Sequence, residues 1–225
     1  MRLVAAAAAI MWAGPAAAQT FLYEPSPPVG SAFVRFVNAA PFDVVVTPGF
    51  GPVETLRAAA DGRVGAYRVA EDVAGRRLAF DVTQGGQVVH ATIEAAAGSF
   101  VTVLIEPQGA SVQAVAVIDQ TEFNQLRARL NFVNASACAS ASLALMPAGQ
   151  KVFDGVARNT GRSRSVNPVA GRLQAGCSEG AAPEFALSGL EAGGQYSIWL
   201  MGAADRLEAF VSRDVTAPVR PQAAR

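Results

Sequence analysis

A five-residue run in the second half of the chain has the pattern of a serine nucleophile. Residues 176–180 read Gly-Cys-Ser-Glu-Gly, and a G-x-S-x-G run between a strand and a helix holds the nucleophile of many hydrolases. That arrangement needs a histidine later in the chain, but the single histidine, His90, lies upstream, and Pro183 follows the motif closely. Because a serine hydroxyl without a base is a poor nucleophile, we expect no catalytic role for Ser178. Its alignment at an offset of 96 with Val82, near a hairpin turn expected at Gly85 and Gly86, indicates a turn residue instead.

The other residues that could carry catalysis are equally isolated. His90 lies in a segment that alternates polar and apolar residues, so we expect it on the surface and not as a general base or metal ligand. The carboxylates show no spacing that identifies an acid and a base, and no phosphate-binding loop is present. The sequence therefore predicts no enzymatic activity, no cofactor and no metal.

Cys138 and Cys177 are the two cysteines of the chain. They lie 39 residues apart and form no C-x-x-C pair, which argues against a redox or metal site. In an oxidising compartment we expect them to form a disulfide, and the chain-entropy model gives such a bond roughly 3 to 4 kcal/mol.

The first 18 residues have the features of a secretory signal. Arg2 supplies the charged start, an apolar stretch follows, and three alanines at 16–18 suit a cleavage site. A proline at position 15 interrupts the stretch before it reaches the roughly 20 residues of a membrane span. We expect an exported protein that begins near Gln19 with an extended, proline-rich arm at residues 19–29 and has no transmembrane segment after cleavage.

Charge is divided unevenly along the chain, although the total is zero. Residues 19–124 hold 11 acidic side chains against 6 arginines, a net of −5, and residues 125–225 hold 7 acidic against 11 basic ones, a net of +4. The positive second half includes a cluster of arginines between residues 158 and 172. This basic cluster could bind an anionic polymer or an acidic partner; the alternative is that the arginines are solvated loop residues. Nucleic acid is an unsuitable partner for an exported, neutral protein. The candidate anion-binding residues are Arg158, Arg162, Arg164 and Arg172.

An internal repeat organises the elements that would position these residues. Residues 32–120 recur as residues 128–216 at an offset of 96. The sequence Phe-Val-Asn-Ala at 36–39 returns at 132–135, Val-Ala-Gly-Arg at 73–76 returns at 169–172, and Phe100 aligns with Tyr196. About ninety residues suits one small β-sandwich, so the repeat predicts two copies of one domain.

Short segments rich in valine, phenylalanine and threonine alternate with turn residues at roughly ten-residue spacing, which is typical of a sandwich. We therefore predict an all-β protein with two tandem immunoglobulin-like antiparallel β-sandwich domains, at residues 30–121 and 127–217. A short, partly packed linker is expected at 122–126 and a disordered tail at 218–225. Gly85 and Gly86 are expected to form a tight hairpin turn. The strand segments expected in the first copy are 32–37, 43–47, 65–69, 77–83, 87–94, 99–106 and 112–118.

Alternation in the first strand separates inner from outer residues. Val34 and Phe36 match apolar residues of the second copy, whereas Arg35 matches Asn131 and should face away from the core. Divergent outer residues are where the halves could differ in function. We therefore name Arg35 as a candidate partner-binding residue. The arm residues Phe21, Leu22 and Tyr23 are also candidates, because a soluble chain gains little by displaying apolar surface; we expect them either to pack on the first sandwich or to bind a partner protein.

The start of the mature chain also resembles a known family. Leu-Tyr-Glu-Pro at 22–25, Pro28, Gly-Ser at 30–31 and Phe-Val-Arg at 33–35 ahead of Asn38 are similar to the opening of AlgF-type alginate biosynthesis proteins. Ser-Val-Asn-Pro-Val at 165–169 is similar to a later segment of that family. Glu24, in place of a frequent glycine, the cysteine pair and the near absence of lysine depart from the family pattern.

The resemblance implies a periplasmic, non-catalytic accessory protein for O-acetylation of an exported polysaccharide such as alginate. Such a protein would work beside separate acetyltransferase proteins and could contact the anionic polysaccharide. The alternative is a general extracytoplasmic carbohydrate-binding or surface protein, since residues 33–40 also resemble secreted immunoglobulin-like domains.

Overall fold

Strands make up nearly all the regular structure of the computed structural model, which describes residues 26–122 and 124–219. Within these ranges the chain has no α-helix, and one 3-10 turn, η1, spans Ala60–Gly62. The prediction of an all-β sandwich fold is confirmed. The signal peptide, most of the proline-rich arm and most of the tail lie outside the described residues.

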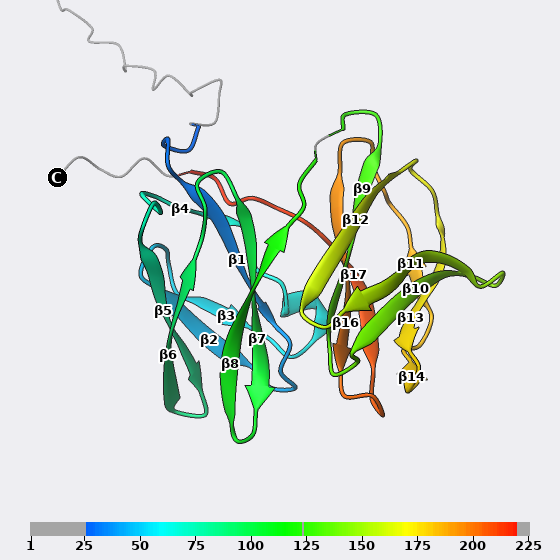
Figure 1. The fold of residues 1–225 in the computed structure, drawn as a ribbon, viewed down its shortest axis with the longest axis horizontal. Coiled ribbons are helices and arrows are strands. Elements are labelled where there is room, and N and C mark those ends of the chain that lie inside the picture. The colour runs from blue at the N-terminus through cyan, green and yellow to red at the C-terminus, as the bar shows by residue number, and fades with distance from the viewer. Residues whose placement is uncertain (1–25, 123, 220–225) are drawn as a thin grey trace, which may run out of the picture.

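The first half of the chain forms two four-stranded sheets that pack face to face (Figure 1). One sheet has the order β4-β1-β7-β8 and the other the order β3-β2-β5-β6. Between them lies one hydrophobic cluster that includes Val34, Phe36, Phe80 and Val103. The strands are β1 (Ala32–Asn38), β2 (Val44–Pro48), β3 (Glu54–Leu56), β4 (Arg68–Ala70), β5 (Arg77–Gln84), β6 (Gln87–Glu94), β7 (Phe100–Gln108) and β8 (Ser111–Asp119).

The second half repeats this plan. One sheet has the order β12-β9-β16-β17, and the other has the order β11-β10-β13-β14, with β15 also pairing with β13. A separate cluster that includes Leu130, Phe132, Leu143 and Ile198 fills the space between them. That each half folds independently stays a prediction. The strands are β9 (Ala128–Ser136), β10 (Ser140–Met146), β11 (Gln150–Ala157), β12 (Thr160–Val166), β13 (Gly171–Cys177), β14 (Gly180–Ala181), β15 (Phe185–Leu187), β16 (Gln195–Gly202) and β17 (Glu208–Arg213).

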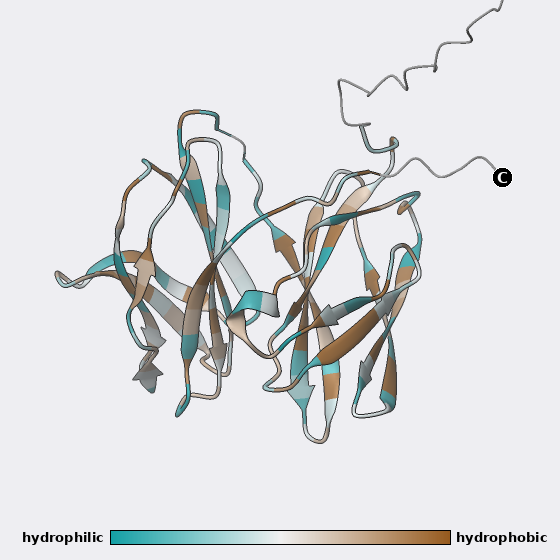
Figure 2. Ribbon diagram, turned by 180° about the vertical axis from the view of Figure 1, so that it is seen from behind, coloured by the Kyte–Doolittle hydropathy of each residue, from teal (hydrophilic) through white to brown (hydrophobic). Residues whose placement is uncertain are grey.

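The hydropathy pattern explains why most of these segments are half-buried strands. Figure 2 shows hydrophobic and hydrophilic stretches that alternate along many of the ribbons. In β5, Leu78, Phe80 and Val82 are buried while the residues between them are more exposed, as expected for side chains that alternate between the two faces of a sheet. In β1 and β9 almost every residue is buried, which requires cover on both faces.

Each half contains one parallel strand pair, which departs from the predicted antiparallel sandwich. β1 pairs in parallel with β7, and β9 pairs in parallel with β16. Because β1 and β2 belong to opposite sheets, β1 does not form a hairpin with its neighbour in sequence. The intervening strands supply the long connection that a parallel pair requires.

The internal repeat is confirmed at its first strand but slips later. Phe36 and Phe132 are both buried at equivalent positions of β1 and β9. The predicted equivalence of Phe100 and Tyr196 is wrong, because Phe100 pairs with Phe33, whereas Tyr196 pairs with Leu130, the counterpart of Val34. The offset has fallen to 95 here, so Tyr196 corresponds to Val101. The positive-φ turn residues Gly98 and Gly193 show the same offset.

The repeated Val-Ala-Gly-Arg sequence likewise has no common structural position. Val73 is buried in the first core, whereas Val169 is 45% exposed. The segments that lead to these two valines differ in structure, because the three-residue strand β4 of the first half is replaced by the seven-residue strand β12 in the second. Differences in loop and strand length therefore separate residues that sequence alone aligns.

The predicted glycine hairpin is confirmed. Gln84 pairs with Gln87, and the two residues between them, Gly85 and Gly86, have φ angles of 55° and 85°. A two-residue turn with positive φ at both positions favours glycine because it has no Cβ to clash. The three-residue strand β3 was not predicted.

The linker was expected to be partly packed, but Leu126 at its end is 82% exposed. The linker is instead held by Arg129, whose Nε donates to the carbonyl of Gln120 at 3.1 Å and whose Nη1 donates to Glu122 at 2.9 Å. After β17 the chain returns to the first half, where the Tyr67 amide donates to the carbonyl of Val215 at 2.8 Å. None of the helical segments in the described residues could cross a membrane.

Candidate functional site

The two halves meet through the outer faces of the sheets that contain β1 and β9 (Figure 1). Register orders the side chains of this interface in rows. Arg35 pairs with Thr102 and, one row further, Val37 pairs with Leu104; in the other half Val133 pairs with Trp199. The apolar rows form a single buried cluster drawn from both halves: Val37, Ala39, Leu104, Val117, Val133, Ala135, Trp199 and Met201.

Arg35 is the centre of a buried polar network in this interface. Its residue exposure is 1%, and its guanidinium reaches both halves. Nε donates to Thr102 Oγ1 at 2.8 Å and Nη2 donates to Ser197 Oγ at 3.0 Å. Nη1 donates to Asp214 Oδ1 at 2.6 Å, and Asp119 Oδ1 lies 3.9 Å from Nη2.

The partners of Arg35 are equivalent residues of the repeat. Thr102 and Ser197 are 95 residues apart, as are Asp119 and Asp214, which matches the offset of the paired strands. In each half the hydroxyl donates to the acid, Thr102 to Asp119 at 2.6 Å and Ser197 to Asp214 at 2.9 Å. One arginine therefore serves two acids, one from each half. A second arginine at Asn131, the repeat counterpart of Arg35, would place like charges together around the small cavity that Asp119 and Asp214 also line.

Aromatic rings enclose this arginine. Its guanidinium carbon lies 4.3 Å from the ring centre of Tyr67 and 5.0 Å from that of Trp199, within the range of cation–π attraction. The Tyr67 hydroxyl donates to Asp119 at 2.8 Å. Burial raises the pKa of Tyr67, partly opposed by the positive charge of Arg35.

Charge and burial act in opposite directions on the ionised groups. Burial alone would lower the pKa of Arg35, but Asp214, Tyr67 and Asp119 raise it overall. Burial raises the pKa of Asp119, and Arg35 together with the hydrogen bonds from Thr102 and Tyr67 partly offsets that rise. Arg35 is thus the main stabiliser of a carboxylate that burial disfavours.

Arg35 therefore faces away from its own sandwich core, as predicted, but the prediction that it could bind a separate partner is wrong. The second half covers the outer face of β1, and the Arg35 side chain is buried in hydrogen bonds within the chain. The other candidate partner-binding residues, Phe21, Leu22 and Tyr23, lie outside the described residues.

The four arginines named from sequence do not form one face. Arg158 reaches Glu106 of the first half, with Nη2 3.1 Å from Oε2, and Arg172 forms an exposed ion pair with Glu184 at 2.7 Å. Only Arg162 and Arg164 lie together, two residues apart on the edge strand β12.

Arg162 and Arg164 are exposed, but hydrogen bonds to the backbone hold their guanidinium groups in place. Nη1 of Arg162 donates to the carbonyl of Asp154 at 3.0 Å, and Nη1 of Arg164 donates to the carbonyl of Val152 at 3.1 Å. Both carbonyls belong to β11, an edge strand of the facing sheet, so the two side chains bridge the open side of the second sandwich. The carboxylate of Asp154 is bonded to Lys151 at 2.8 Å. The remaining guanidinium groups can donate outward.

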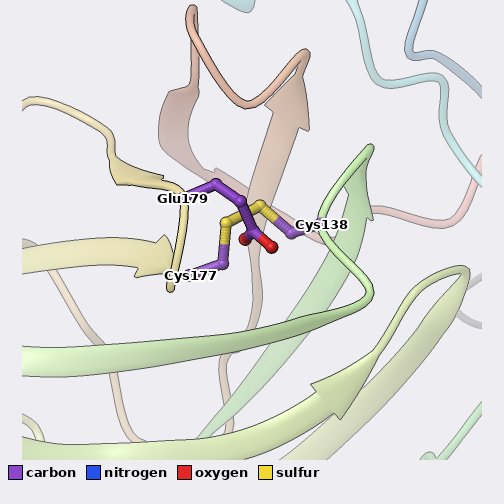
Figure 3. A group of neighbouring side chains, drawn as sticks. All are labelled: Cys138, Cys177 and Glu179. Carbon is purple, nitrogen blue, oxygen red and sulfur yellow. A yellow bond between two sulfur atoms is a disulfide. The ribbon is translucent and has the colours of Figure 1, made fainter.

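Cys138 and Cys177 are joined by a disulfide, as predicted (Figure 3). It ties the loop before β10 to the end of β13. The Glu179 carboxylate lies close enough to the two sulfur atoms to resemble a three-ligand metal cluster. A disulfide sulfur is not the thiolate that a metal binds, so in this state Glu179 is the one anionic ligand of the group.

Ser178 lies in the tight turn between β13 and β14, as expected from its sequence context. His90 belongs to the first half, with its side chain 80% exposed and Nδ1 2.6 Å from Asp81 Oδ1. The structure thus places the serine and the histidine in different halves.

A cleft of about 520 Å³ opens where the apolar rows of the interface end. Its small residues come from both halves, and Ala39 and Pro41 are the repeat counterparts of Ala135 and Ala137. This site cannot be recognised from the sequence, because it forms only when the two halves pack together. Its charged lining residues are Arg63, Glu106, Arg158, Asp205, Arg206 and Glu208.

Glu106 and Arg63 are the buried charged residues of the cleft, with exposures of 1% and 6%. Oε2 of Glu106 accepts hydrogen bonds from Arg158, Asn159 and Gln113, whereas Oε1 has no partner among the described residues. Burial lowers the pKa of Arg63, opposed by Glu208 at 3.2 Å.

Comparison with known proteins gives no family for this chain. No family model matches it, and no curated protein matches it. Among solved structures, a family 26 carbohydrate-binding module of Eubacterium rectale Amy13K, in complex with maltoheptaose, is similar over 84% of this chain and 98% of that chain. The identity is 11% and the TM-score 0.26, and nothing about ligands follows from so low a score.

Proposed function

We propose that the protein is an exported, non-catalytic binding protein for an anionic polysaccharide, held as one rigid two-lobed unit. The observation that carries this proposal is the oriented pair Arg162 and Arg164. Their guanidinium groups are fixed by β11 carbonyls and remain exposed, which suits charge-assisted contacts to carboxylates.

Two further features agree with this role. A disulfide between the cysteines is typical of proteins in oxidising, extracytoplasmic compartments; the periplasm is the compartment we propose. The buried Arg35 network fixes the halves relative to each other, so surfaces of both could act on one ligand.

The test is the affinity of residues 19–225 for fluorescent uronate oligosaccharides, measured by anisotropy at low and high salt. Arg162→Gln with Arg164→Gln should weaken low-salt binding about fivefold or more, given the usual strength of exposed charge pairs. The matched control is Arg172→Gln, because Glu184 already neutralises that charge, and its affinity should stay within about twofold. Equal affinity of the double variant and the control would refute the role of the pair.

A second candidate is the accessory role in polysaccharide O-acetylation, beside separate acetyltransferases. The observation that favours it is the sequence resemblance of residues 22–38 and 165–169 to AlgF-type proteins. Within that segment Asn38 is wholly buried, and its Nδ2 donates to the carbonyls of Phe42, Leu56 and Arg57, so part of the resemblance reflects the fold.

Affinity capture from periplasm at low salt tests this second candidate. Recovery of an acetyltransferase with the tagged chain, together with lower polymer acetylation when the chain is deleted, would support the accessory role. Normal acetylation in the deletion strain would exclude it and leave the binding protein as the proposal.

A further inference from the structure

The cleft between the halves has the size and construction of a small-ligand site. Its volume of about 520 Å³ falls within the few hundred to one thousand Å³ common for ligand pockets. Small residues such as Ala39, Pro41 and Ala135 line it, together with Gly202, so a ligand can approach the backbone of both halves closely. It also lies apart from the Arg162–Arg164 pair, although Arg158, which lines it, comes just before β12.

The cleft wall holds a buried acceptor with an unmet hydrogen bond. Glu106 is 1% exposed, and its Oε2 takes three donors while its Oε1 takes none from the described residues. Buried polar atoms nearly always have a partner, and leaving one without costs about 1–3 kcal/mol. Arg158, which donates to the other oxygen of this carboxylate, has a side chain 46% exposed, and both residues line the cleft.

Charge selects the kind of ligand. Three arginines and three acids line the cleft, and two of the acids are paired, Glu106 with Arg158 and Glu208 with Arg63. Arg206 and Asp205 also line the cleft, make no ion pair within the described part of the chain, and so offer it one donor group and one acceptor group. A nearly neutral cleft with both donors and acceptors suits a ligand rich in hydroxyl groups, each of which can donate and accept.

We propose that this cleft binds a short saccharide segment through its hydroxyl groups, one of which donates to Oε1 of Glu106. The proposal rests on the proposed polysaccharide-binding function and deepens it. The Arg162–Arg164 pair attracts the polymer by charge, and the cleft distinguishes one sugar from another by hydrogen bonding. Binding in the cleft is therefore insensitive to salt, unlike attraction by the arginine pair.

The experiment is calorimetric titration of residues 19–225 with two panels of hexasaccharides, one neutral and one of uronates, at low and high salt. Ala137→Trp fills the cleft from an exposed position. The matched control for Ala137→Trp is Ala79→Trp. Ala79 is an exposed alanine on the outer face of β5, in the sheet of the first half that does not contain β1. Thermal unfolding of both variants shows whether either change disturbs the fold.

We expect at least one hexasaccharide to bind at high salt. Ala137→Trp should weaken that binding by at least about tenfold and Ala79→Trp by less than about twofold. Glu106→Gln should weaken it by about tenfold, because the three donors at Oε2 hold the amide oxygen there and place the NH2 group, a donor, at the Oε1 position. High-salt binding that survives Ala137→Trp, or no binding at high salt by any hexasaccharide, would overturn the cleft proposal. Low-salt binding that depends on Arg162 and Arg164 would then still support the proposed function, so the two failures are distinguishable.

Discussion

Replacing Arg35 by methionine should destabilise the protein strongly, and by an amount that depends on pH. The substitution keeps an unbranched but shorter side chain and removes the charge from between Asp119 and Asp214. Removing one member of a buried ion pair costs about 3–5 kcal/mol because the remaining charge is left buried. Asp119 is the critical acid, with 3% of its side chain exposed against 10% for Asp214.

Protonation sets a ceiling on this cost. A carboxylate left without its cation can take up a proton, which costs about 1.36 kcal/mol for each pH unit above its ordinary value of 3.8. The ceiling for Asp119 is thus about 4 kcal/mol at pH 7 and about 1.6 kcal/mol at pH 5. Asp119 also keeps its hydrogen bonds from Thr102 and Tyr67, so we expect a loss of about 3 kcal/mol at pH 7.

The sign of the pH dependence follows from linkage. Burial raises the folded-state pKa of Asp119 above the unfolded value, so stability due to this group is present at acid pH and falls as pH rises through the folded pKa. Without Arg35 that folded pKa rises further, and the loss extends to higher pH. The difference between Arg35→Met and the wild type should therefore be larger at pH 7 than at pH 5.

Urea unfolding at both pH values, followed by tryptophan fluorescence from the interface residue Trp199, measures these differences. A rescue variant is available, because Asn131 is the repeat counterpart of Arg35 and lines the small cavity that Asp119 and Asp214 also line. Arg35→Asn combined with Asn131→Arg should recover part of the loss. A cost below about 1 kcal/mol at pH 7 for Arg35→Met, or a cost that grows on acidification, would refute this account of the interface.

Three further outcomes are expected. Replacing Cys138 and Cys177 by serine should lower the free energy of unfolding by about 4 kcal/mol in the chain-entropy model for a 39-residue separation, and thiol counting on wild-type protein under denaturing, non-reducing conditions should find no free thiol. Ser178→Ala should leave saccharide binding and cellular polymer acetylation unchanged, and loss of acetylation at a normal protein level would revive an enzymatic role. Asn38→Ala should lower stability by about 2 kcal/mol or more, because the carbonyls that its amide now satisfies lose a buried donor; calorimetric melting measures it.

The strands and one turn were accessible from sequence because their causes are local. Alternation in β5 and the Gly85–Gly86 turn depend on neighbouring residues alone, and both were predicted with bounds close to those observed. The equivalence of Phe36 and Phe132 was accessible because both lie in the first strand, before any difference in length accumulates. The Phe100 and Tyr196 alignment failed because one residue is lost between that strand and β16, and the repeat pattern does not show where.

The functional geometry was less accessible because it depends on how the halves pack. A residue that faces away from one sandwich was expected at the surface, but for Arg35 the surface of the first sandwich is the interior of the whole protein. The cleft beside Glu106 combines residues from loops far apart in sequence. Of the four arginines proposed as an anion-binding surface, Arg162 and Arg164 share a strand, while the fold separates Arg158 and Arg172 from them; their role stays a prediction.

The return of the chain from β17 to Tyr67 means that the halves are connected at two places. Besides the linker at residues 120–127, residues 214–217 run along the first half, where Tyr67 exchanges two backbone hydrogen bonds with Val215 and Ala217. Cutting the exposed linker at Leu126 would therefore yield two fragments that remain associated, each with its own hydrophobic cluster. The protein could accordingly be expressed as two complementary pieces whose reassembly reports the strength of the interface.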